Sequence, residues 1–137
     1  MKMIIRGFAL AIVGFVVSLV YVNYAIVDFH ETQLIYATQN AMFTTQEAEK
    51  HYVVDCEYQD NPIKVFDDEE AYFEDFKANF LKQITSKNTT FDFTLLNADL
   101  EKGLLSVEIV EHYFNVLGQP KTTTIQKTSI VNVLGYE

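Results

Sequence analysis

A run of 21 uncharged residues, from Gly7 to Val27, restricts most strongly how this chain can fold. As an α-helix, the run is roughly 30 Å long and matches the hydrocarbon core of a bilayer. The sequence therefore predicts one transmembrane helix, with residues 7–27 in contact with the bilayer.

The charges that flank this run predict its orientation. Lys2 and Arg6 precede it, and Asp28 and Glu31 follow it. The positive-inside rule then places the N-terminus in the cytoplasm and the rest of the chain in an extracytoplasmic domain. A cleaved signal peptide is the alternative, but its apolar core is shorter and ends at a small-x-small site that this sequence lacks. A retained, single-pass anchor in the cell membrane is the favoured interpretation.

The acidic character of the remaining chain limits its partners. All 19 Asp and Glu residues follow position 27, against 8 Lys, which makes this part −11. Nucleic-acid binding requires a basic surface, so we expect no nucleic-acid partner. Anionic headgroups would also repel such a domain, so we expect it to stand off the membrane surface.

The predicted helix continues beyond the membrane, because residues 28–50 contain no Gly and no Pro. A helix from about Met3 to about Lys50 is roughly 70 Å long. A set of mostly small residues recurs at spacings of three and four on one face of this extension: Leu34, Ala37, Ala41, Thr44 and Ala48. Small residues let another backbone approach closely. This seam either packs on the chain's own domain or forms an assembly interface between subunits.

The C-terminal part reads as a small α+β domain. Asp67 and Asp68 are N-cap candidates for an amphipathic helix from about 68 to 85, with apolar residues at helical spacing. Apolar and polar residues then alternate in three segments separated by turns at Gly103 and Gly118, which predicts an antiparallel meander, with a bulge near Val110 where the alternation changes parity. A fourth, short strand is expected around Tyr52–Tyr58. The expected organisation is residues 1–50 as anchor helix and extension, and 51–137 as the head domain.

No arrangement of residues indicates an enzyme, a metal site or a cofactor. The acidic run from Asp67 to Glu70 lacks the spacing of a calcium loop, and the three His residues show no metal-ligand spacing, so we expect them to be structural or surface residues. Glu108 and Glu111 are expected on the polar outer face of the sheet. Cys56 is interpreted as a small half-buried side chain, with an intermolecular disulfide as the alternative.

The layout of a short basic N-terminus, an apolar helix that continues outside and an α+β head resembles type IV pilin-like proteins. Arg6-Gly7-Phe8 is similar to the prepilin processing site, which implies cleavage between Gly7 and Phe8. The family usually has Glu at the fifth position after cleavage, where this chain has Ile12. Pseudopilins of the tight-adherence (Tad) type often lack a clean processing site, and the small-residue stretch of residues 34–48 is similar to theirs. The resemblance covers residues 1–50 in pattern and the head in architecture.

Two functions from different classes follow. The first is a structural subunit: a pilin- or pseudopilin-like component of a bacterial surface filament, secretion or conjugation apparatus, which self-associates through its helix. The second is a bitopic scaffold or binding module, similar to assembly factors of type IV secretion channels, which binds partner proteins through its extracytoplasmic domain.

Overall fold

The computed structural model describes residues 2–56, 68–100 and 102–130 of the chain. The elements follow in the order α1 (Lys2–Cys56), α2 (Glu69–Gln83), β1 (Thr90–Asp99), β2 (Leu104–Phe114) and β3 (Pro120–Ile130). The strands form one antiparallel sheet in the order β1-β2-β3. The predicted α+β fold with a long N-terminal helix and a three-stranded meander is therefore confirmed.

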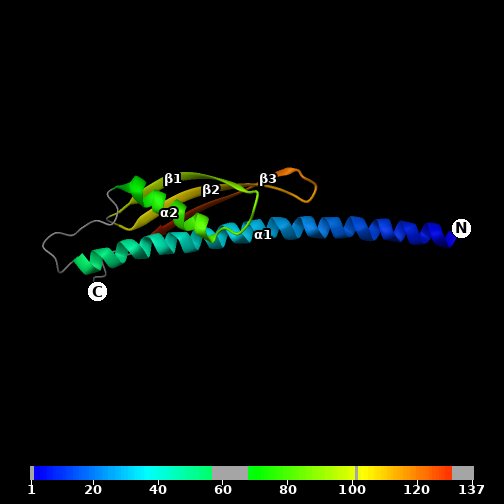
Figure 1. Ribbon diagram of the computed structural model, residues 1–137, viewed down its shortest axis with the longest axis horizontal. Helices are drawn as coiled ribbons and strands as arrows, with labels where there is room; N and C mark the ends of the chain where they lie inside the picture. Colours follow the sequence, from blue (N-terminus) through cyan, green and yellow to red (C-terminus); the bar gives the residue numbers. More distant parts are fainter. Residues whose placement is uncertain (1, 57–67, 101, 131–137) are drawn as a thin grey trace.

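Helix α1 runs the whole length of the molecule, and the head packs along only one half of it (Figure 1). The helix continues through residues 52–56, so the predicted strand is wrong there; residues 57 and 58 lie outside the described part. Val53 and Val54 favour a strand only weakly, whereas each residue added to an existing helix gains a backbone hydrogen bond.

Helix α2 begins where its sequence predicts. The side chain of Asp68 accepts a hydrogen bond of 2.8 Å from the backbone N–H of Ala71, as an N-cap residue does. Glu69 and Glu70 follow in the first turn, where acidic groups complement the helix dipole. The helix ends at Gln83, close to the predicted end at 85.

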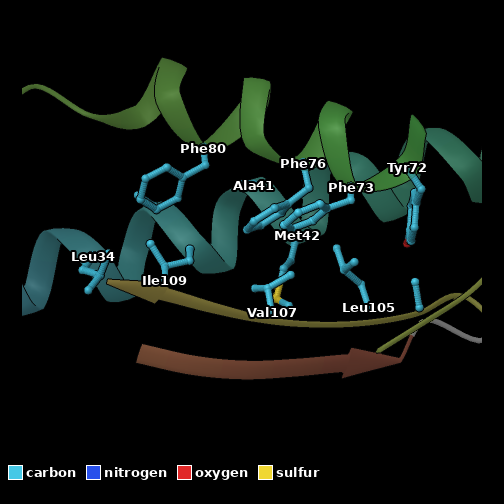
Figure 2. Close-up of a cluster of buried hydrophobic side chains, with 12 residues drawn as sticks. Leu34, Ala41, Met42, Tyr72, Phe73, Phe76, Phe80, Leu105, Val107 and Ile109 are labelled. Carbon is cyan, nitrogen blue, oxygen red and sulfur yellow. The ribbon is translucent and has the colours of Figure 1, made fainter. Parts of the chain in front are cut away.

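Both helices cover the same face of the sheet, with α2 over β1 and α1 over β3. Figure 2 shows aromatic side chains of α2 pointing towards β2, with Leu34, Ala41 and Met42 of α1 beside them. The buried hydrophobic core residues come from both helices and from strands β1 and β2: Leu34, Ala37, Ala41, Met42, Tyr72, Phe73, Phe76, Phe80, Ala98, Leu105, Val107 and Ile109. The core therefore joins the two predicted parts, 1–50 and 51–137, into one unit.

Strand β2 keeps one alternation along its whole length, so the predicted change of parity and bulge near Val110 are wrong. Ile109, Glu111 and Tyr113 all face inward and are buried. The apolar alternation is interrupted in the sequence because an acid, Glu111, occupies an inward position. The register irregularity lies instead in β1, between Leu95 and Asn97.

Candidate interaction site on the long helix

The inner face of α1 meets the sheet through a buried His–Glu pair. Nδ1 of His30 lies 2.7 Å from Oε1 of Glu111, and both side chains are almost wholly enclosed. The His30 ring also stacks on Tyr113, with ring centroids 3.9 Å apart. Burial raises the pKa of the Glu111 carboxyl above its ordinary value of 4.5, and the hydrogen bond and charge of His30 act in the opposite direction. Glu111 was expected on the outer face; it lies inward because His30 satisfies it.

A second polar contact joins α1 to the opposite end of the sheet. The amide of Gln46 donates to the carbonyl oxygens of Gly103 and Ser129, at 3.0 and 3.2 Å. Its own oxygen accepts a 2.9 Å hydrogen bond from the Ser129 hydroxyl. Gln46 is 2% exposed, so every one of these bonds lies in a region where an unpaired polar group is costly.

A third polar contact joins α1 to α2. The hydroxyl of Thr45 donates to the carboxylate of Asp75 and accepts from the amide of Asn79. Asn79 also donates to Asp75 within α2, at 2.8 Å. The three contacts hold α1 against the head at both of its ends and against its helix, so the head cannot slide along α1 without leaving buried polar groups unpaired.

The predicted seam divides between the inside and the outside of the molecule. Leu34, Ala37 and Ala41 are at most 3% exposed and pack in the chain's own core, whereas Thr44 and Ala48 are exposed. An assembly interface made of all five residues is therefore wrong, because three of them are already covered by the head. Packing on the chain's own domain, the alternative drawn from the sequence, accounts for these three.

The opposite face of α1 carries large aromatic side chains that nothing in the described chain covers. Phe29, Tyr36 and Phe43 lie seven residues apart and are 52%, 62% and 63% exposed. Helices that wind around each other carry apolar residues at two positions of a seven-residue repeat, and these three residues fill one of the two, with polar residues at the positions three and four later. We call Phe29, Tyr36 and Phe43 the outer stripe.

Hollows lie beside the outer stripe. One, of about 370 Å³, is lined by Thr32, Ile35, Tyr36 and Gln39. These four positions have the i, i+3, i+4, i+7 spacing of the hole that receives one side chain of a facing helix in knobs-into-holes packing. A neighbouring hollow of about 400 Å³ is lined by Gln39, Asn40, Met42, Phe43, Gln46, Lys127 and Ser129.

The same seven-residue recurrence extends through the apolar run, at Phe8, Phe15 and Val22, all of which are exposed. Three positions after each of these, the residue is small: Ala11, Ser18 and Ala25. Alternating large and small residues allow close helix packing in a membrane. The outer stripe was not predicted, because the predicted seam followed the small residues alone; the recurrence of aromatic residues is the signal in the sequence that marks it.

The other residues singled out from the sequence contribute less to a candidate site. Gly7 and Phe8 of the predicted processing site lie within α1, and Phe8 is 69% exposed. His112 lies at the surface, with Nε2 2.8 Å from Oδ2 of Asp92, and so is a surface residue as predicted. Among the residues that the structure describes, no group of three His, Cys, Asp or Glu side chains could hold a metal ion.

Within the described chain, one helix is long and apolar enough to cross a membrane, and it is α1. None of its most apolar 18-residue window is buried inside the molecule. This agrees with membrane anchoring by a single span. Comparison with protein-family models, curated proteins and solved structures finds no match to this chain.

Proposed function

We propose that this chain is a membrane-anchored structural subunit that assembles through the outer stripe of α1. In this proposal residues 7–27 span the membrane, the N-terminus is cytoplasmic and the head is extracytoplasmic. The assembly would be a pilin- or pseudopilin-like part of a bacterial surface filament, secretion or conjugation apparatus.

The outer stripe is the observation that carries this proposal. Tyr36 and Phe43 lie nine and sixteen residues beyond the apolar run, so their exposed rings face water in an isolated subunit. A facing helix with the same seven-residue repeat would cover them and would fill the hollow at Thr32, Ile35, Tyr36 and Gln39. The repeat also continues through residues 8–22, so one helix of a second subunit could follow it in membrane and water alike.

Truncation of the outer stripe tests the proposal. In the double variant Tyr36→Ala/Phe43→Ala, we expect the assembled fraction in mild detergent extracts to fall about tenfold, because two buried aromatic anchors are lost. Sedimentation or native electrophoresis measures this fraction. The matched control is Leu81→Ala/Leu96→Ala, which truncates two apolar side chains that are exposed to a similar degree, 54% and 48%, elsewhere on the head.

If the double variant has the same unfolding transition as the wild type, a lower assembled fraction reflects lost subunit contacts and not lost folding. An assembled fraction equal to that of the wild type would reject the outer stripe as the subunit contact. A substitution in the predicted seam, such as Ala41→Leu, does not test assembly. Ala41 is fully buried in the chain's own core, so a larger side chain there tests folding.

The second candidate function, a bitopic scaffold, is supported by the open face of the sheet. Both helices lie on one face, and the outward side chains of the other, among them Asp92, Glu108 and Gln126, remain accessible. In that case a fragment of residues 28–137, which retains the whole core, would keep partner binding without the membrane helix. Loss of binding in this fragment, together with the effect of Tyr36→Ala/Phe43→Ala, would favour the structural subunit.

A further inference from the structure

The turn between β2 and β3 exposes apolar side chains where turns are usually polar. Phe114, Val116 and Leu117 are 63%, 42% and 65% exposed. They are adjacent in sequence and lie at the tip of a hairpin, so they form one small apolar surface. In water, such a surface is a cost unless a partner covers it.

Four backbone N–H groups of this turn are paired within the turn. The side-chain oxygen of Asn115 accepts hydrogen bonds from the N–H groups of Leu117 and Gln119, at 3.0 and 2.8 Å. The backbone of Asn115 pairs with Gln119 and Gly118 as well, each at 3.0 Å. Asn115 itself is 7% exposed, so its amide is enclosed while Phe114, Val116 and Leu117 are presented to the outside. The paired N–H groups lower the cost of entry into an apolar phase, because unpaired backbone groups are costly there.

The hairpin tip lies level with the end of the apolar run. Tyr113 stacks on His30, and each strand residue beyond it advances about 3.3 Å against about 1.5 Å for each helix residue. The turn therefore reaches the level of about residues 23–27 of α1. In Figure 1 the β2–β3 turn lies beside α1, beyond the rest of the head towards the N-terminus.

Partial burial along α1 agrees with this placement. One face of the helix between residues 19 and 27 is half-buried, while the residues around it are exposed; its members are Leu19, Asn23, Ile26 and Val27. Tyr21 and Tyr24 lie at the same level of the helix and are 74% and 73% exposed. Tyrosine side chains favour the membrane–water interface.

The charges near the tip also suit a lipid surface. No Asp or Glu occurs between Glu111 and Glu137, although the chain carries 19 of them, and Lys121 is exposed just after the turn. A lysine there can direct its ammonium group to headgroup phosphates. The β2–β3 segment that carries the tip therefore brings no carboxylate of its own to the lipid surface; the acids nearest to this level along α1 are Asp28 and Glu31, just beyond the apolar run.

We infer that the β2–β3 hairpin tip, residues 114–117, inserts into the lipid interface of the bilayer that α1 spans. The inference rests on the proposed membrane span of α1, and it makes the hairpin a second contact of the same molecule with the same leaflet. Two contacts fix the tilt and rotation of the head relative to the membrane, which one helix alone does not. The outer stripe would then face a defined direction in the membrane plane.

The test uses the full chain in phosphatidylcholine vesicles, with Cys56 replaced by Ser and a fluorescent label at one introduced cysteine. The labelled variants are Leu117→Cys at the tip, Tyr24→Cys on α1 and Thr124→Cys on β3. Lipids with a nitroxide near the headgroup quench labels at the interface. We expect quenching at Leu117→Cys of at least about half that at Tyr24→Cys, and none above background at Thr124→Cys.

The possible outcomes distinguish the hairpin contact from the membrane span of α1 and from contact of the whole head with lipid. Quenching at Tyr24→Cys with Leu117→Cys no different from Thr124→Cys would overturn the hairpin contact and leave the anchor intact. No quenching at Tyr24→Cys would overturn the membrane span itself, and the hairpin contact with it. Equal, strong quenching at all three positions would mean that the whole head lies on the lipid, and would overturn a contact specific to the tip.

Discussion

At the scale of single residues, Glu111 has the most unusual environment that the structure describes. It is an acid 1% exposed in the inward row of β2, paired with His30 of α1. A buried carboxylate without a partner is strongly destabilising, so the pair ties the end of the head nearest the apolar run to α1. The pair lies at the junction between the apolar run and the head, where a small shift would move the whole head.

Glu111→Gln tests how this acid is charged. Because burial raises the pKa of Glu111 above 4.5, the folded chain binds this proton more tightly than the unfolded chain. Its contribution to stability is therefore complete below pH 4.5 and is lost as the pH rises through the raised pKa. We expect the wild type to lose stability relative to Glu111→Gln as the pH rises, measured by urea unfolding in mild detergent. Parallel pH profiles for the two chains would contradict the raised pKa.

At the scale of elements, α2 contributes four of the twelve buried hydrophobic core residues from a single face. Phe76 and Phe80 are fully buried, and the ring of Phe80 meets Phe91 and Phe93 of β1 edge-on, with both centroid distances 5.2 Å. The start of α2 depends on Asp68, which follows a segment outside the described residues. The cap therefore determines where this face begins and which aromatic residues point to the sheet.

Asp68→Ala removes the cap of α2. The N–H of Ala71 then loses its acceptor, and we expect the free energy of unfolding to fall by about 1 kcal/mol. Asp68→Asn is the matched control, because the amide oxygen also accepts this bond, and it should stay close to the wild type. Chemical denaturation of the three chains measures the difference. Equal losses in both variants would mean that the charge of Asp68, rather than its hydrogen bond, stabilises the helix.

At the scale of the whole molecule, α1 carries both the apolar run and part of the core of the head. Its residues Leu34, Ala37, Ala41 and Met42 are core residues of the head, so the boundary between the apolar run and the head lies within one continuous helix. Any force or tilt applied to the apolar run reaches the head directly, because the helix is continuous between them. This rigid connection suits a subunit whose helix makes the assembly contacts.

Two fragments test this shared core. We expect the fragment of residues 28–137 to fold, because it holds all the core residues named above. We expect the fragment of residues 57–137 not to fold, because the loss of Leu34 and Met42 exposes a large apolar face of α2 and β2. Near-ultraviolet circular dichroism and urea unfolding measure folding in each. A cooperative transition of residues 57–137 at the urea midpoint of 28–137 would show that α1 is dispensable for the core.

The sequence by itself determined the membrane-length helix, the position of α2 and the three-stranded meander. Each follows from a local pattern: an uncharged run, an N-cap before apolar residues at helical spacing, and alternation between turns. Only the tertiary structure decided which face of α1 is covered. The small residues Ala37 and Ala41 suit a second subunit or the chain's own domain equally well, and in the structure they pack in the chain's own core. The inward position of Glu111 was hidden for the same reason, because its partner His30 lies 81 residues away and no local pattern joins them.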